Sequence, residues 1–212
     1  MTTRLIMRER IGREIRRPGL TTQINEAIAT AVMVAQSDRL FFTESRGLTF
    51  STAASQEFYS SSDDANIGRI LKFDYVKINI GGTLFELRQM KPERIEALSD
   101  SGAQVGQPSG YCYYAEQIRL YPVPSEVFEV RIGAQINVAA PASDDETGNR
   151  WMSDGELLIR SRAKMELAIH VLRDQQLAAD MAAIYGTEMD RLKRKTNQLV
   201  QQGGWRVEGD MC

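Results

Sequence analysis

The sequence predicts an α+β protein in which a β-rich domain is inserted into a helical hairpin or bundle. Three patterns predict this fold. Apolar residues recur at helical spacing near both ends, alternation typical of strands fills about a hundred central residues, and a long helical pattern follows residue 150. The expected boundaries are 1–40 for N-terminal helices, 41–141 for the inserted antiparallel β-sheet or small β-sandwich, 142–202 for a long C-terminal helix, and 203–212 for a tail.

Size and composition place the chain among ordinary globular proteins. Its 212 residues suffice for one or two domains, and 42% of them are hydrophobic. A net charge of −2 argues against a protein that coats nucleic acid, although it allows a local basic stripe. Cys112 and Cys212 do not form a disulfide framework, and no signal peptide or membrane-spanning run stands out. We therefore expect free thiols and a soluble intracellular product without a membrane partner.

Residues 2–17 are rich in arginine and carry only a thin apolar stripe, which predicts a weakly anchored helix. Six arginines stand against two glutamates there. Either acidic neighbours balance these charges, or the segment is a basic surface that contacts nucleic acid or an acidic partner subunit. The second hypothesis assigns the contact to Arg4, Arg8, Arg13, Arg16 and Arg17.

A second helix is predicted after the break at Pro18-Gly19. Thr21-Thr22 is a plausible cap, and apolar residues from Ile24 to Ala35 recur at a spacing of three and four. We expect this stripe to pack against the long C-terminal helix.

The central segment reads as strands joined by turns. Residues 40–42 and 48–50 are predicted strands around a turn at 45–47, while 51–66 is an uncertain strand and loop. Residues 71–80 alternate almost perfectly, Gly81-Gly82 predicts a hairpin, and 83–88 returns. A short helix is expected from Lys91 to Leu98.

Three further strands are expected at residues 111–114, 118–121 and 127–133, forming a meander. The first two carry Tyr111, Tyr113, Tyr114 and Tyr121, which could stack bases. Aromatic residues at a spacing of two in strands are more often core or cross-strand pairs, and we favour that interpretation.

The long C-terminal helix is the element around which the rest is expected to be organised. Ser153-x-x-Glu156 matches a capping box, with Trp151 buried just before it. About 48 helical residues would span roughly 70 Å, with Gly186 as the expected kink. This length exceeds the diameter of such a domain, so we favour a distal half that reaches a neighbouring subunit or partner over a helix packed only on its own domain. The hypothetical partner interface comprises Arg191, Lys193, Arg194, Lys195, Trp205, Arg206, Val207 and Met211.

The sequence carries no recognisable catalytic, cofactor or metal motif. The single histidine, His170, lacks the partners of a triad or a metal site. Asp144-Asp145-Glu146 lacks the alternating ligands of a calcium loop and is expected to be a solvated loop. We therefore expect no enzyme activity, cofactor or metal.

Four segments in order resemble the head-to-tail adaptor (connector, or head-completion) proteins of short-tailed bacteriophages, the podoviruses: RRPGLTTQINEAIATAV, RLFFTE, GQPSGYCYYAEQIRLYPVPSEVFEVRI and WMSDGELLIRSRAKMELA. The resemblance covers most of residues 16–185 and rests on the order and spacing of these segments. It implies a virion structural protein made in the bacterial host cytoplasm. It further implies a homo-oligomeric ring of twelve copies, bound to the portal protein and to tail nozzle or tail fibre proteins, through which phage DNA passes during ejection.

Three alternatives remain open. The chain could be another tail ring component such as a nozzle or tube protein, a tail-associated cell-wall hydrolase with an unrecognised carboxylate pair, or a nucleic-acid-binding protein that uses the arginines of residues 4–17.

Overall fold

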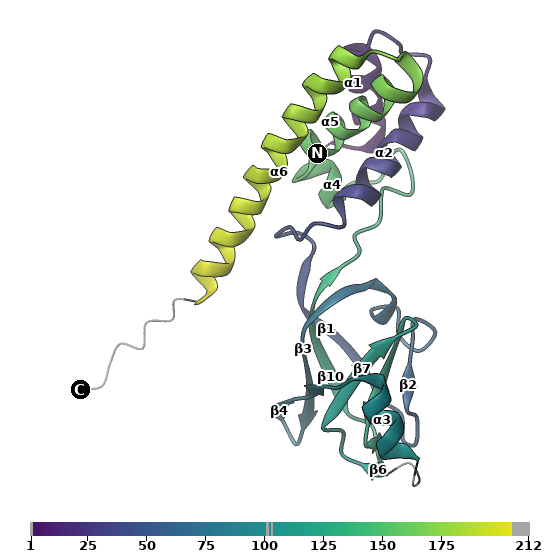
Figure 1. Ribbon diagram of the computed structural model, residues 1–212, viewed down its shortest axis with the longest axis vertical. Helices are drawn as coiled ribbons and strands as arrows, with labels where there is room; N and C mark the ends of the chain where they lie inside the picture. The colour runs from purple at the N-terminus through teal and green to yellow at the C-terminus, as the bar shows by residue number, and fades with distance from the viewer. Residues whose placement is uncertain (1, 101, 103, 205–212) are drawn as a thin grey trace, which may run out of the picture. The chain divides into compact units, whose positions relative to one another are not determined.

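The computed structural model describes residues 2–100, 102 and 104–204. The chain divides into two compact units, Met1–Thr43 with Val138–Cys212 and Glu44–Asn137. The first unit is helical and the second consists mainly of strands (Figure 1). The predicted α+β class with a long C-terminal helix is confirmed.

The helical unit comprises α1 (Arg4–Glu14), α2 (Thr21–Ala35), α4 (Arg150–Ser153), α5 (Glu156–Leu167) and α6 (Gln175–Gly204). The predicted stripe of α2 is buried, and its small residues Ala27 and Ala31 leave room for a neighbouring helix. That neighbour is α5, which contacts α6 in turn. The expectation that α2 packs on the segment predicted as the long C-terminal helix is therefore borne out for the first part of that segment, which is α5.

Trp151 is buried in the centre of this unit, as predicted. Its side chain has no exposed surface, its ring packs edge-on against Phe42 at 4.9 Å, and its Nε1–H donates to the carbonyl of Val138 at 2.6 Å. The indole therefore joins the segment that leaves the helical unit to the segment that returns to it.

The first helix is anchored more firmly than its sequence indicates. Met7 and Ile11 are fully buried in the same core as Trp151. The Thr3 hydroxyl accepts a hydrogen bond from the backbone amide of Ile6 and so caps α1. The thin apolar stripe is sufficient because both of its central residues are completely covered.

The expected continuous helix of residues 153–202 is divided in two, and the break is not at Gly186. After α5 the backbone widens into a π-helical turn at Ala168–Leu172, and Arg173 adopts a left-handed conformation with φ of 54°. Asp174 then accepts a hydrogen bond from the amide of Leu177 and caps α6. Gly186 lies inside α6. The sequence signal was Asp174, a strong cap residue, which the uninterrupted run of helix formers obscured.

Two predicted caps were also wrong. The Ser153 hydroxyl donates to the carbonyl of Asn149 instead of capping α5, which begins after Gly155 without a side-chain cap. It is Asn149 that caps α4, by accepting from the amide of Trp151. Thr21 and Thr22 lie within α2, whose N-cap position is Leu20.

Residues 40–42 form a turn, not the predicted strand. The Thr43 hydroxyl accepts from the amide of Leu40, and Leu40 and Phe42 are buried in the helical core. A short apolar run does not by itself distinguish a strand from a buried turn. The predicted turn at 45–47 is a bulge between Ser45 and Leu48 inside a single strand.

The second unit contains ten strands and two short helical segments among its described residues: β1 (Glu44–Ser51), β2 (Phe58–Tyr59), the 3-10 turn Ile67–Arg69, β3 (Ile70–Ile80), β4 (Thr83–Glu86), β5 (Arg88–Gln89), α3 (Pro92–Ser99), β6 (Val105–Gly106), β7 (Gly110–Tyr114), β8 (Gln117–Tyr121), β9 (Val123–Pro124) and β10 (Glu129–Ile136).

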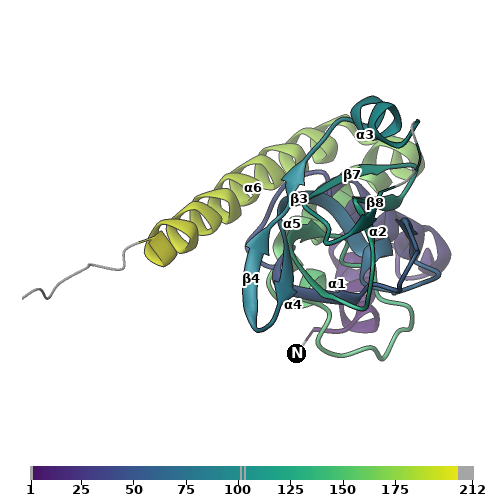
Figure 2. The same ribbon diagram turned by 90° about the horizontal axis from the view of Figure 1, so that it is seen from below.

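These strands form two four-stranded sheets, ordered β1-β10-β3-β4 and β2-β8-β7-β5, and a small parallel pair β6-β9. Figure 2 shows β4 beside β3 and β8 beside β7. The predicted hairpin of β3 and β4 is confirmed, and both Gly81 and Gly82 have the positive φ that its two-residue turn requires. The predicted meander was wrong in one respect. β7 and β8 pair, but β10 belongs to the other sheet, between β1 and β3.

Aromatic side chains connect the two sheets. The ring of Phe73 on β3 packs against Tyr111 at 5.6 Å and Tyr113 at 5.0 Å, both on β7. Phe50 on β1 packs against Tyr59 on β2 at 5.2 Å. Burial raises the pKa of Tyr59 and Tyr111 above that of a free phenol. The strand aromatics are therefore chiefly core residues, as favoured above.

Replacing Trp151 with alanine should destabilise the helical unit by about 3–5 kcal/mol, because it leaves a large cavity and removes the hydrogen bond from the indole to the carbonyl of Val138. Urea unfolding of W151A measures this. Leu157→Ala, at an exposed position of α5, is the matched control and should cost less than about 1 kcal/mol. Equal losses in the two variants would contradict the central role of Trp151.

Candidate functional site

The basic residues predicted on the last helix mostly serve to hold it in place. Lys193 forms an ion pair with Asp38 at 2.6 Å, and this hydrogen bond raises the pKa of the lysine. The Lys195 ammonium lies 4.0 Å above the ring of Phe41. Arg191 pairs with Glu188 on α6 itself.

Thr196 adds a third link between α6 and the same loop. Its hydroxyl accepts from the amide of Phe41 at 2.9 Å and donates to the carbonyl of Leu192 at 2.8 Å. The segment of residues 38–41 is therefore clamped to α6 by an ion pair, a cation–π contact and a hydrogen bond. Of the four predicted basic residues on α6, Arg194 is exposed and takes no part in this clamp.

The apolar stripe of α6 continues past the clamp. Met181, Met189 and Leu192 are buried, whereas Leu199 and Val200 on the same helix are 45% and 46% exposed. Figure 1 shows that α6 extends past the other helices of its unit. Two adjacent exposed apolar side chains on this part of the helix form a surface suited to a protein partner. The remaining predicted residues, Trp205, Arg206, Val207 and Met211, lie outside the described part of the chain.

The N-terminal arginines separate into two groups. Arg4 and Arg8 both pair with Asp144, at 2.8 and 2.6 Å, and Arg10 pairs with Glu156. These contacts tie α1 to the loop before α4 and to α5. They lower the pKa of the Asp144 carboxyl. Charge balance by acidic neighbours thus accounts for this half of the segment.

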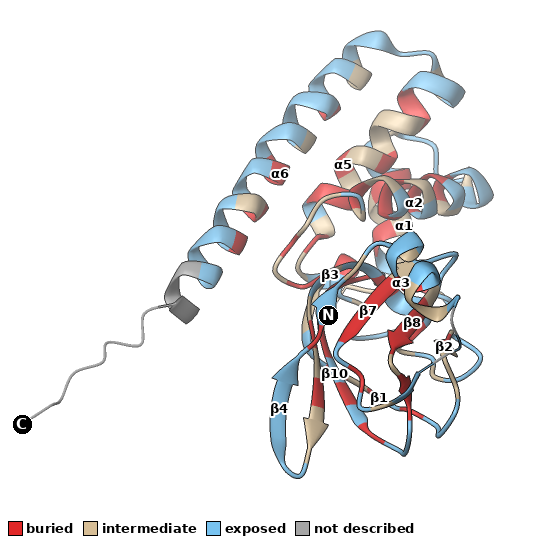
Figure 3. Ribbon diagram, turned by 60° about the horizontal axis from the view of Figure 1, so that its bottom comes forward, coloured by how far each residue is buried: buried red, intermediate tan, exposed pale blue. Residues whose placement is uncertain are grey.

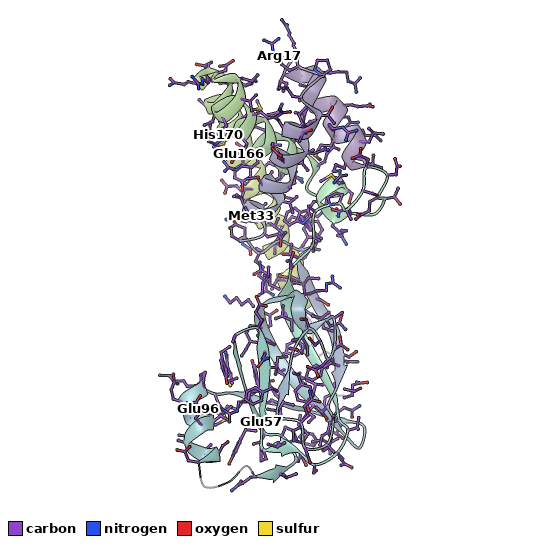
Figure 4. The ribbon with its side chains drawn as sticks, turned by 90° about the vertical axis from the view of Figure 1, so that its right-hand side faces the viewer. Arg17, Met33, Glu57, Glu96, Glu166 and His170 are labelled. Atoms are coloured by element: carbon purple, nitrogen blue, oxygen red, sulfur yellow. The ribbon has the colours of Figure 1, made fainter. Side chains whose placement is uncertain are left out.

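Arg13, Arg16 and Arg17 form the second group and are exposed at the corner between α1 and α2. Arg16 has a φ of 55°, which turns the chain after α1. Arg17 is labelled at this end of the unit in Figure 4. We call these three residues the arginine corner. It is the part of the predicted basic segment that a partner can reach.

The acidic loop is structural. Asp144 binds two arginines, and Glu146 accepts from the amide of Ala142 at 2.7 Å and from the side chain of Asn149 at 3.1 Å. Among the described residues, no group of three or more His, Cys, Asp or Glu side chains could hold a metal ion. The prediction of a merely solvated loop underestimated how many contacts this segment makes.

His170 lies on the π-helical turn with most of its side chain exposed, and its Nε2 is 3.3 Å from a carboxylate oxygen of Glu166 (Figure 4). Arg162 binds the other oxygen of Glu166 at 2.5 Å. These three side chains stabilise the end of α5 and provide no nucleophile for an acid–base pair.

Sequence reasoning missed one buried ion pair in the β unit. Arg119 is 7% exposed, binds Glu57 at 2.6 Å and lies over the ring of Phe58 at 5.1 Å. The available signal was an arginine between Ile118 and Leu120 in a buried strand, which required a partner. The pair connects β8 to the segment before β2.

A comparison of the sequence with protein-family models matches the SU10 adaptor protein over residues 1–207. The chain belongs to the SU10 adaptor family. The family comprises structural proteins of bacteriophages and not enzymes, so this member is a phage structural adaptor and a component of the virion. A comparison with curated proteins finds no match. Among the described residues, no helix of this family member is long and apolar enough to cross a membrane.

Replacing Asp144 with asparagine should lower stability at neutral pH, because Arg4 and Arg8 lose their ionised partner. A carboxyl with a lowered pKa stabilises the fold above its unfolded-state pKa of about 3.9, and this contribution is lost as the pH falls through the folded-state value. The difference in melting temperature between the native chain and D144N should therefore be largest near pH 7 and disappear towards pH 2–3. Asp145→Asn, at the exposed neighbouring position, is the control. A difference independent of pH would refute this account.

Proposed function

We propose that copies of this chain form a ring, of twelve subunits, between the portal and the tail nozzle or fibres of a phage, and that the ring surrounds the path of the DNA. The family match over residues 1–207 is the observation that carries this proposal. Two exposed surfaces support the proposal, the distal part of α6 and the arginine corner. A subunit of such a ring must contact the neighbouring subunits as well as the portal and the tail proteins.

The distal part of α6 is the proposed portal-binding surface. Leu199 and Val200 supply apolar area, and the exposed Lys195, four residues before Leu199, supplies a positive charge on the same face of the helix. Clamping by Asp38 and Phe41 keeps this part of the helix ordered before binding, which lowers the entropy cost of docking. A partner groove with an apolar floor and an acidic rim would match these residues.

Native mass spectrometry of the chain mixed with the portal of the same phage tests this assignment. We expect a stoichiometric ring on the portal for the native chain and at least a tenfold loss of affinity for Leu199→Asp with Val200→Asp. Ala182→Asp with Ala183→Asp places the same charges on another exposed part of α6 and should bind normally. A small stable oligomer without a portal complex would contradict the adaptor position and favour a nozzle or tube component.

The arginine corner is proposed to contact the passing DNA or an acidic neighbouring subunit. A conduit should hold DNA only weakly, since tight binding would oppose ejection. Three exposed arginines against a net charge of −2 agree with weak, local attraction.

The salt dependence of DNA binding distinguishes these two contacts. If the corner contacts phosphates, replacing Arg13, Arg16 and Arg17 with alanine should reduce the slope of log affinity against log salt by up to about three. Replacing the exposed Arg46, Arg88 and Arg131 of the β unit removes the same charge and should leave the slope nearly unchanged. An unaltered slope in the first variant would exclude the DNA contact and leave an acidic subunit as its partner.

A further inference from the structure

The strand β4 is an open edge of the first sheet. It pairs with β3 on one side, and among the described residues no strand lies on its other side. The amide of Leu87 donates to the carbonyl of Val76, which fixes the phase of the ladder. Because hydrogen-bonded pairs alternate in an antiparallel ladder, the N–H and C=O groups of Leu84 and Glu86 point away from β3. They are four backbone groups in position to bind an added strand.

At the opposite edge of the same sheet, an outward backbone carbonyl already has a side-chain donor. On β1 the amide of Thr52 donates to the carbonyl of Phe128, so the phase of that ladder turns the carbonyl of Thr49 outward. The side-chain amide of Asn66 donates to this carbonyl at 3.0 Å. Proteins generally protect sheet edges in this way. The difference between the two edges marks β4 as the one left free for pairing.

The side chains of β4 are unusually apolar for an open edge. All four of its residues are exposed, with Leu84 at 41% and Phe85 at 47% (Figure 3). Phe85 lies opposite the buried Ile78, so its ring is at the open margin of the core. An added strand with an apolar face would cover Phe85, while its other face would meet Glu86.

The last eight residues of the sequence have this pattern. Trp205-Arg206-Val207-Glu208-Gly209-Asp210-Met211-Cys212 alternates apolar or small residues with charged ones through Met211, which is the period of a strand with one apolar face. They follow directly after α6, which ends at Gly204. Eight extended residues span about 27 Å, more than enough to cover the four residues of β4.

We propose that residues 205–212 of one copy add as an antiparallel strand to β4 of a second copy. This inference rests on the proposed ring, since it supplies a contact between neighbouring subunits. Placing Val207 opposite Phe85 puts Arg206 opposite Glu86 and Glu208 opposite Leu84. Arg206 and Glu208 then exchange backbone hydrogen bonds with the four open groups of β4, and Arg206 meets a carboxylate. The parallel arrangement would put Glu208 opposite Glu86, which disfavours it.

A mixture of two full-length variants tests the proposal. Leu84→Pro removes an N–H group of β4 that points away from β3 and leaves the hydrogen bonds between β3 and β4 intact. This variant therefore has a blocked β4 edge and an intact tail. Arg206→Pro with Glu208→Pro has a blocked tail and an intact edge. Each variant alone should be monomeric in sedimentation, and the mixture should form a one-to-one dimer. In the dimer, hydrogen exchange at the amides of Leu84 and Glu86 in the chain that carries Arg206→Pro and Glu208→Pro should be at least tenfold slower than in that chain alone.

Leu84→Ala, which keeps the N–H, is the matched control for the edge and should retain at least part of the tail binding that Leu84→Pro loses. A mixture that stays monomeric up to the solubility limit overturns the proposal. Protection of Leu84 and Glu86 in the native chain that does not depend on concentration also overturns it, because the tail would then bind its own chain. Neither result bears on the ring itself, which the portal experiment tests separately.

Discussion

The contact of Trp151 with Phe42 and Val138 is the constraint on which the helical unit depends. A domain can be inserted into another only if the two ends of the insertion lie close together in the host fold. One residue separates Phe42 from the start of β1, and one residue separates Val138 from the end of β10. The indole packs on the first and hydrogen bonds to the second. The helical core is therefore completed by residues on both sides of a 94-residue insertion, and it closes where the insertion begins and ends.

Electrostatic contacts reinforce the same arrangement from outside the core. Arg4 and Arg8 bind Asp144 in the segment that returns from the β unit, and Glu14 binds Arg160 and Lys164 on α5. Each pair is partly exposed and contributes modestly by itself. Together they fix the N-terminal helix to elements more than a hundred residues away in the sequence. Half of the arginines near the N-terminus are thus paired inside the subunit, and the arginine corner is the half that other molecules can reach.

The fold class, the main strands and the burial of Trp151 could be predicted because each follows from local periodicity. Residues 70–80 alternate, Gly81-Gly82 permits a tight turn, and a tryptophan just before a helix has an obvious place in the core. The division of the last helix could not be found in the same way. Residues 168–172 have ordinary helical propensity, and the cap residue Asp174 stands in a run of helix formers, so local periodicity does not mark the turn after which α6 packs against α5.

The sequence could predict which residues make up the candidate surfaces, but not which of those residues remain exposed and unpaired in the folded subunit. The sequence marks Arg4, Arg8, Arg13 and Lys193 equally as basic residues, whereas long-range contacts decide which of them are already paired. The open edge of β4 depends on strand order, which alternation does not specify. Pairing of β10 between β1 and β3 makes β1 and β4 the outer strands, and the side chain of Asn66 binds a backbone carbonyl of β1.

The clamp at Thr196 also sets the direction in which the end of the chain leaves the subunit. Thr196 is the last buried residue of α6 whose side chain is described, and eight helical residues follow it, or about 12 Å of rigid rod. A helix turns by about 100° per residue, so the rod transmits an orientation as well as a distance. One residue inserted after Thr196 would rotate everything beyond it by more than a quarter turn, whereas seven inserted residues would nearly restore the original direction. The contacts of Thr196 with the rest of the helical unit thus fix the direction in which the residues after it face a binding partner.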